Sequence, residues 1–121
     1  MRFHSYAASA AISAASKSIY KFKLGCAIVY KNRIISIGYN KNKTHPKSNT
    51  DHNTIHAELD AIIKVWDEDL SDCFLYVCRI KKDNSFGLAK PCYWCMNLIR
   101  EKNIRNVYHT DNNNRWIKLK I

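Results

Sequence analysis

Glycine and proline are scarce in this chain, which contains three Gly and two Pro among its 121 residues. Such a composition argues against a flexible linker or a low-complexity region. The sequence shows no internal repeat and no stretch long and apolar enough to span a membrane. Hydrophobic residues make up 46% of the chain, an ordinary proportion for a globular protein. We therefore expect one compact domain over residues 1–121, of the α/β or α+β class.

The cysteines lack the even number and regular spacing of a disulfide framework. The chain has five of them, and an odd, irregular set suits a reducing compartment, so a cytoplasmic location is predicted. Three lie inside apolar, strand-like runs and are predicted to be small buried hydrophobic residues: Cys26, Cys73 and Cys78. Cys92 and Cys95 differ, because a Cys-x-x-Cys pair can bind a metal or carry out redox chemistry.

A signal-peptide pattern is also missing from the N-terminus. Residues 1–20 are rich in Ala and Ser rather than Leu, so they contain no region as hydrophobic as that of a usual signal peptide. This segment is predicted to be a helix whose small residues pack against a sheet.

Acidic residues are few relative to basic ones. Ten Asp and Glu against 20 Lys and Arg give a formal net charge of +10. This excess favours anionic partners, namely nucleotides, nucleic acid or a membrane surface. The basic residues are scattered over both halves of the chain, whereas the acids gather between Glu58 and Asp72. The lysines could instead serve solubility, and charge alone does not separate the two roles.

Apolar periodicity and turn residues predict eight elements in the order α-β-β-α-β-α-β-β. The predicted helices span residues 2–20, 54–67 (with Thr54 as N-cap) and 92–102, and the predicted strands span residues 24–30, 33–39, 73–80, 104–109 and 116–121. Lys31-Asn32 is predicted to be the two-residue turn of a hairpin. Polar loops are expected at residues 40–53 and 81–90, and loops as long as the first are often functional.

The connections between these elements predict an α/β fold with a five-stranded mixed sheet. Strands separated by a helix should be parallel neighbours joined by right-handed crossovers. The last strand follows the fourth after too few residues for a crossover. It should therefore pair antiparallel with the fourth strand or leave the sheet.

Two short segments, each at the start of a predicted helix, carry the residues best suited to chemistry. They are His56-Ala57-Glu58 and Pro91-Cys92-Tyr93-Trp94-Cys95. His56, Cys92 and Cys95 offer one nitrogen and two sulfur ligands for Zn²⁺ and leave a fourth position open, which is the pattern of catalytic zinc sites. A helix N-terminus favours the thiolate forms. Glu58 can then take a proton from a zinc-activated water and pass it to the reacting group of a substrate.

His-x-Glu followed by Pro-Cys-x-x-Cys is similar to the signature of the zinc deaminases that act on cytosine, adenine and related bases. The chain resembles that superfamily over nearly its whole length, and small deoxycytidylate-deaminase-like proteins most of all. The resemblance implies hydrolytic deamination, one zinc ion per chain and a three-layer α-β-α fold of the cytidine deaminase type. A structural zinc site or a redox motif accounts less well for the cysteine pair. The structural site would need a fourth ligand, and the redox motif would have no need of His56.

The resemblance also implies contacts to a substrate. Asn40 matches an Asn that hydrogen-bonds the sugar or base, although it could instead satisfy a turn. Phe22 resembles a residue that lines the sugar pocket, with core packing as its alternative, and the carbonyl of Ala57 is expected to face the leaving amine. Further candidates for the pocket wall are Pro91, Tyr93, Trp94, Tyr108 and His109. In some relatives a second zinc binds near His45 and His52, which could also meet a substrate phosphate or simply be exposed.

Four substrate classes fit these features. A free cytosine nucleotide or nucleoside, such as deoxycytidylate (dCMP) or cytidine, is favoured by the His ligand. Cytosine or adenine within single-stranded DNA or tRNA is favoured by the charge. Another purine or pterin base is the third class, and a non-catalytic, zinc-stabilised nucleic-acid-binding module is the fourth, which would leave Glu58 without a purpose. A homo-oligomer is expected from the resemblance, with the N-terminal helix and Trp116 as contacts unless they belong to the core.

Overall fold

The helices and strands occur in the predicted order, with one additional short strand. The structure, a computed structural model, describes residues 3–41 and 55–119. The elements found there are α1 Ser5–Ala15, β1 Lys23–Tyr30, β2 Arg33–Tyr39, α2 Ala57–Ile63, β3 Phe74–Ile80, β4 Phe86–Gly87, α3 Tyr93–Glu101, β5 Asn106–Thr110 and β6 Trp116–Leu119.

The strands form one mixed sheet in the order β2-β1-β3-β5-β6, and β4 pairs with one end of β3. β3 and β5 are parallel neighbours, as predicted for strands separated by a helix, and β6 pairs antiparallel with β5, as predicted for the last strand. The expectation that β2 and β3 would be neighbours is wrong, because β1 lies between them and pairs antiparallel with both. The sheet has six strands rather than five, because the predicted loop 81–90 contains β4.

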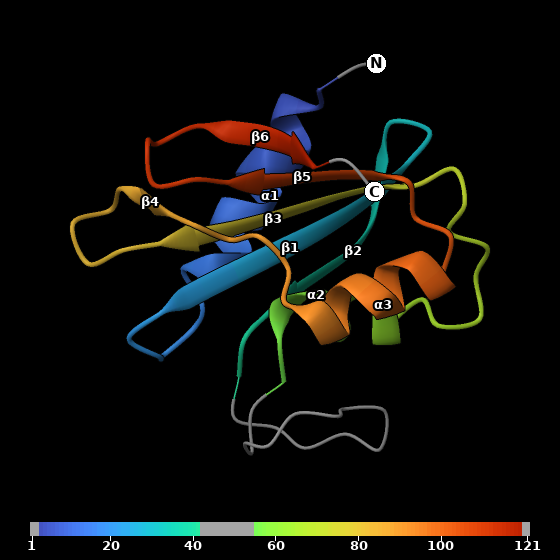
Figure 1. Cartoon of the computed structure of the whole chain (residues 1–121), viewed down its shortest axis with the longest axis horizontal. Coiled ribbons are helices and arrows are strands. Elements are labelled where there is room, and N and C mark those ends of the chain that lie inside the picture. Colours follow the sequence, from blue (N-terminus) through green and yellow to red (C-terminus); the bar gives the residue numbers. More distant parts are fainter. Residues whose placement is uncertain (1–2, 42–54, 120–121) are drawn as a thin grey trace.

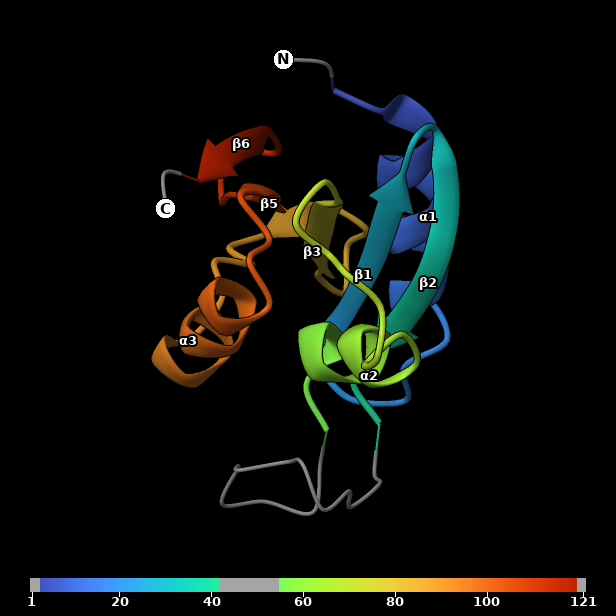
Figure 2. The same ribbon diagram turned by 90° about the vertical axis from the view of Figure 1, so that its right-hand side faces the viewer.

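Helices cover both faces of this sheet, which confirms the three-layer α-β-α fold. Helix α1 lies on one face, and α2 and α3 lie on the other (Figures 1 and 2). Ala7, Ala11 and Ala15 of α1 pack against Tyr76 and Val29 of the sheet. The cluster under α2 and α3 contains Leu59, Ile62, Leu98 and Ile99 from the helices and Ile28, Leu75, Val77 and Val107 from the strands.

The three cysteines predicted to be buried have exposed fractions of 0%. Cys26 and Cys73 belong to the cluster under α2 and α3, and Cys78 belongs to the cluster under α1. The Ala-rich helix is also part of the core, as its buried alanines show. Trp116 packs against Tyr76 and Phe86, at ring-centroid distances of 5.8 and 5.9 Å. Among the described residues, no helix is long and apolar enough to cross a membrane.

All three helices are shorter than predicted. Helix α1 ends at Ala15 because the amides of Lys17 and Ser18 bond to carbonyls three residues back, which tightens the chain out of the α-helix. Helix α2 ends at Ile63 in the same way. The N-cap expected at Thr54 is also wrong, because α2 begins at Ala57 with His56 as its N-cap.

Glycines let helices approach the sheet closely. A Cβ atom on Gly38 of β2 would lie 2.5 Å from the backbone nitrogen of Ala61 and 2.6 Å from the carbonyl oxygen of Ala57, both in α2. On the other face, a Cβ on Gly25 of β1 would meet the backbone of α1 at Ala11 and Ala15. Gly38 therefore sets the distance between β2 and the helix that carries Glu58.

We expect Gly38→Ala to lower the free energy of unfolding by about 1–3 kcal/mol, because backbone atoms cannot rotate out of the way of the added methyl group. Gly87→Ala is the matched control. The nearest atoms to its Cβ would belong to the flexible side chain of Arg79, with Cδ at 2.9 Å. Denaturation with urea measures both variants, and equal losses of stability would contradict this role of Gly38.

Candidate metal centre and catalytic cavity

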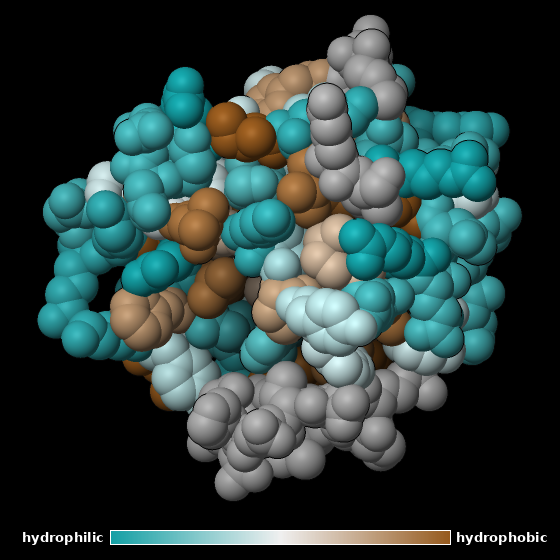
Figure 3. Space-filling view, in the orientation of Figure 1, coloured by the Kyte–Doolittle hydropathy of each residue, from teal (hydrophilic) through white to brown (hydrophobic). Residues whose placement is uncertain are grey.

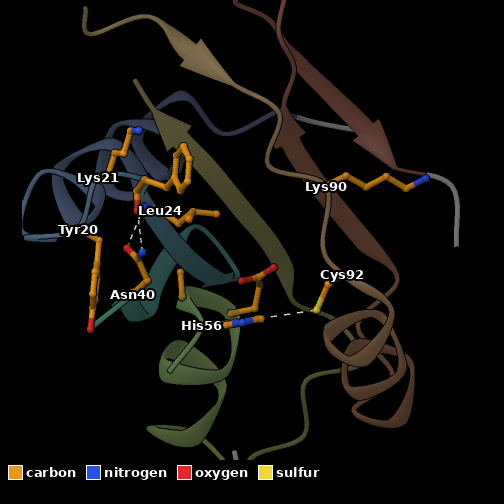
Figure 4. Close-up of a pocket in the computed structure, with 10 residues that line it drawn as sticks. Tyr20, Lys21, Leu24, Asn40, His56, Lys90 and Cys92 are labelled. Carbon is orange, nitrogen blue, oxygen red and sulfur yellow. Dashed lines mark hydrogen bonds between the residues drawn. The ribbon is translucent and has the colours of Figure 1, made fainter. Parts of the chain in front are cut away.

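The N-termini of α2 and α3 bring three potential metal ligands together. His56 is the N-cap of α2 and Cys92 is the N-cap of α3. Both residues have extended backbones, and neither side chain makes a capping hydrogen bond. The side chains are therefore free to face each other across the gap between the helices (Figure 4). Nδ1 of His56 lies 3.4 Å from Sγ of Cys95 and 3.8 Å from Sγ of Cys92.

This group fits a zinc ion. Its three ligand atoms all lie within 4.8 Å of one another. With Zn–N bonds of about 2.0–2.1 Å and Zn–S bonds of about 2.3 Å, neighbouring ligands of a tetrahedral ion lie roughly 3.5 Å apart. The two N···S distances fall on either side of that value. Within the described part of the chain the group has three members, so the fourth position of a tetrahedral ion would be open to water or substrate.

The two thiols differ in their tendency to ionise. The pKa of Cys92 is lowered to about 5, chiefly by a hydrogen bond from the Cys95 thiol, with further help from the Cys95 amide and His56. The pKa of Cys95 is raised by that same bond, by burial and by the charge of Glu58. The pair therefore shares a proton, which a metal ion would displace, because thiolates are the metal-binding form.

Glu58 is a buried carboxylic acid at the first turn of α2. Its residue is 4% exposed, and burial raises the pKa of its carboxyl, against the lowering effect of its own backbone amide and of His56. A carboxylate whose pKa is raised toward neutrality can both accept and return a proton.

His56, Glu58 and Cys92 line one cavity of about 390 Å³, and Cys95 is not part of its lining. Its lining includes six predicted site residues, two of them from the metal group, together with four residues that the sequence pattern missed. The predicted ones are Phe22, Asn40, His56, Ala57, Glu58 and Cys92, and the others are Tyr20, Lys21, Leu24 and Lys90. Asn40 and Tyr20 lie on one side of the cavity, with Cys92 and Lys90 on the opposite side (Figure 4).

Asn40 positions the wall of this cavity. Its Nδ2 donates to the carbonyl of Phe22 at 2.7 Å, and its Oδ1 accepts from the amide of Leu24 at 3.0 Å. The alternative role of Asn40, satisfying backbone groups near a strand end, is therefore observed. One N–H and one lone pair of the amide are left over, so a contact to substrate remains compatible with it.

The buried Asp60 ties α2 to the end of β2 next to Asn40. Its Oδ2 accepts from the Tyr39 amide at 3.1 Å and pairs with Nζ of Lys41 at 2.9 Å and of Lys64 at 3.6 Å. Because Asp60 is two residues from Glu58 on the same helix, these bonds hold the catalytic candidate at a defined distance from the cavity wall.

Asn40→Ala is expected to lower the free energy of unfolding by about 1–2 kcal/mol, because it leaves the Phe22 carbonyl and the Leu24 amide without their partners. Thermal unfolding of the Asn40→Ala variant and of the unaltered protein measures this loss of stability. Asn113→Ala, at an exposed turn position in the described chain, is the control and should change stability by less than about 0.5 kcal/mol. An Asn40 variant as stable as that control would show that the wall does not depend on this side chain.

Several predicted pocket residues lie elsewhere. His109 is buried in β5, with its Nδ1 2.9 Å from the carbonyl of Thr110, and it is not among the residues that line the cavity. Tyr108 stacks on Tyr76 under α1, with ring centroids 5.0 Å apart. Pro91 is buried directly before the N-cap of α3, and Tyr93 is 82% exposed. Neither of them lines the cavity.

Trp94 packs against the core beneath α2 and α3 and is likewise outside the cavity lining. His45 and His52, the candidates for a second zinc, lie outside the described residues.

Known proteins of similar sequence and structure share this arrangement of elements. The cytidine deaminase of Burkholderia pseudomallei superposes with a TM-score of 0.73 at 19% identity, covering 98% of this chain and 93% of that one. The dCMP deaminase of cyanophage S-TIM5, in complex with dCMP and dUMP, gives a TM-score of 0.63 at 21% identity, covering 87% and 77%. At these identities the likeness shows the fold.

A relative by sequence is described as "Probable deoxycytidylate deaminase" from Caenorhabditis elegans. It is 30% identical over 103 residues, which are 74% of this chain and 47% of the relative, so the chain spans about half of that protein's length. The model of the family "Cytidine and deoxycytidylate deaminase zinc-binding region" matches residues 1–110. These residues include both motifs at the metal group, and the chain belongs to the cytidine and deoxycytidylate deaminase family.

Proposed function

We propose that this protein is a zinc-dependent deaminase that converts a cytosine nucleotide or nucleoside to its uracil form and releases ammonia. One observation carries the proposal: the imidazole of His56, the thiol of Cys92 and the buried carboxyl of Glu58 line a single cavity, and the thiol of Cys95 completes the metal group beside it. Each of the four has a role in hydrolysis at an amine-bearing carbon, and a binding module would have no use for Glu58.

His56, Cys92 and Cys95 would hold the zinc ion. When bound in an open site, zinc lowers the pKa of water toward neutrality and so supplies a nucleophile at physiological pH. Glu58 would accept a proton from the attacking water, and its burial, which raises the pKa of the carboxyl, favours this transfer. It would deliver this first proton to the pyrimidine ring nitrogen, then take the second proton of the attacking water and deliver it to the amine, which departs as ammonia.

The rest of the cavity would hold the base and its sugar. Leu24 and the ring of Phe22 offer apolar surface, and Asn40 has one donor and one acceptor position left for polar groups of the ligand. The carbonyl of Ala57 is proposed to face the amine. The S-TIM5 enzyme, whose structure is in complex with dCMP and dUMP, supports a cytosine nucleotide as the substrate class.

Ammonia release from a panel of substrates tests this proposal. The panel contains deoxycytidylate, deoxycytidine, cytidine, guanine, single-stranded DNA and tRNA, each with the zinc-loaded protein and with protein stripped of metal by a chelator. We expect release from at least one free cytosine compound, dependent on zinc. Release from guanine alone, or from DNA or tRNA alone, would overturn the choice of substrate.

A further inference from the structure

The chain segment before Cys92 lies between the ends of two neighbouring strands. β4 pairs with the end of β3, and residues 88–91 continue from β4 to Cys92, the N-cap of α3. The other side of this segment faces the end of β5 and the turn between β5 and β6 (Figure 1). Residues 86–91, which we call the ligand segment, therefore connect the sheet to one side of the metal group.

Two asparagine side chains of the β5–β6 turn bind the ligand segment. Oδ1 of Asn114 accepts a hydrogen bond from the amide of Phe86 at 2.9 Å. Oδ1 of Asn112 accepts one from the amide of Leu88 at 3.0 Å. These amides belong to alternate residues, as do the amides of a strand that face one neighbouring strand. The two side chains, which we call the asparagine clamp, therefore take the place of a neighbouring strand.

Thr110 adds a buried connection at the same place. Its Oγ1 accepts from the amide of Arg79 in β3 at 3.1 Å and donates to the carbonyl of Gly87 at 2.7 Å. Its own carbonyl accepts from the amide of Ala89 at 3.0 Å. Together, the clamp and Thr110 pair one backbone group of every residue from 86 to 89.

The turn that carries the clamp is fixed by its own hydrogen bonds. Oδ1 of Asp111 accepts from the amides of Asn113 and Arg115 at 2.9 and 3.0 Å, and its Oδ2 pairs with the Arg115 guanidinium at 3.2 Å. Asn114 has a φ of 63°, in the left-handed region that Asn tolerates better than most residues. Hydrophilic side chains cover this edge of the molecule, at the left in Figure 3. Because these bonds lie within the turn, the clamp has a defined position from which to hold the ligand segment.

Cys92 is the potential metal ligand whose position depends on the ligand segment. Cys95 lies inside α3 and is fully buried, whereas Cys92 is exposed and precedes the first turn of that helix. The side chain of Cys92 makes no capping hydrogen bond. Lys90, two residues earlier, lies on the same side of the catalytic cavity (Figure 4). The backbone that precedes Cys92 therefore decides how its thiol faces His56.

We propose that Asn112 and Asn114 are positioning residues for the metal centre. They hold the ligand segment so that Sγ of Cys92 lies 3.8 Å from Nδ1 of His56. The inference rests on the proposed function and adds to it two residues outside the cavity lining. Groups that orient a metal ligand commonly change metal affinity about 10- to 100-fold when they are lost. Because the clamp acts on Cys92 through the backbone, we expect the lower end of that range.

The test variant is Asn112→Ala/Asn114→Gly, in which glycine keeps the left-handed backbone at position 114. Asn113→Ala/Asn103→Gly is the matched control. It removes one further side chain from the same turn and one from Asn103, which also has a φ of 63°. Neither of these two side chains takes part in the bonds to the ligand segment described above. Asn112→Asp/Asn114→Asp is the rescue variant, because a carboxylate keeps both acceptor oxygens.

The rate of zinc release to an excess of chelator, measured well below the unfolding temperature, tests the proposal. We expect release about tenfold faster from the test variant than from the unaltered protein. The control and the rescue variant should stay within about twofold of the unaltered protein. Equal release from the test variant and the control would overturn the proposal. A test variant that is less stable but releases zinc at an unchanged rate would likewise show that the clamp supports only the fold.

These measurements separate the inference from the proposed function. If no cytosine compound is deaminated, the function fails, yet zinc release still reports on the clamp, because it needs no substrate. If the protein binds no zinc, hydrogen exchange decides. The amide of Met96 donates to the carbonyl of Cys92 at 2.8 Å and should exchange about tenfold faster in the test variant than in the control, since the loss of two modest hydrogen bonds favours local opening. Equal exchange in the two variants would then overturn the inference.

Discussion

Replacing Glu58 with Gln is expected to lower kcat for cytosine deamination by about 10²- to 10⁴-fold, the usual contribution of a general acid and base. The amide has nearly the same shape, so the packing of the 4%-exposed side chain is retained. It cannot accept a proton from water or return one to the ring. Ammonia release under saturating substrate measures kcat, and metal analysis should find the same zinc content as in the unaltered protein.

The matched control is Glu101→Gln, which removes a carboxylate from the exposed end of α3. It should keep kcat within about twofold of the unaltered protein, as expected for a surface change away from the cavity. A Glu58→Gln protein with full activity would show that another group moves the proton. Loss of zinc together with activity would show that Glu58 holds the metal instead.

Cys95→Ala is expected to lose zinc and with it at least about 10³-fold in kcat, since a single electrostatic donor in an active site is already worth about that much. The remaining imidazole and thiol are too few ligands for a stable zinc site. Cys95 is fully buried, so the loss of its sulfur also removes core contacts. Zinc content and kcat are measured on the same preparation.

Cys78→Ala controls for the loss of a buried sulfur. Cys78 is also fully buried, and burial raises the pKa of its thiol to about 12, so it is a neutral core residue at physiological pH. This variant should keep its zinc and its activity, and both variants should lose some stability through the cavities they create. Equal zinc content in the two proteins would contradict the role of Cys95 as a ligand.

The sequence predicted the main elements because hydrophobic runs and turn residues are local signals. The turn at Lys31 and Asn32 has positive φ angles of 48° and 63°, as the two-residue hairpin requires. The position of β1 between β2 and β3 could not be predicted, because it depends on pairing between Lys23 and Ile80, 57 residues apart. Strand β4 was missed because two residues are too few to show an alternating pattern.

The metal group could be predicted because each motif lies at the start of a helix. The walls of the cavity could not, because Tyr20, Lys21 and Lys90 lie outside the helices and strands, where periodicity gives no orientation. The sequence also could not show on which face of the sheet Tyr108 lies. Neighbouring residues on a strand point to opposite faces, and Tyr108 belongs to the face covered by α1. Which face an aromatic residue occupies follows from the packing of the helices.

X-ray absorption at the zinc K-edge tests the central claim most directly. The protein purified with zinc is expected to show one nitrogen at about 2.0–2.1 Å, two sulfurs at about 2.3 Å and one further light atom. His56, Cys92 and Cys95 supply the first three, and the fourth marks the open position that hydrolysis requires. A spectrum with four protein ligands, with a single sulfur, or without zinc would contradict the account.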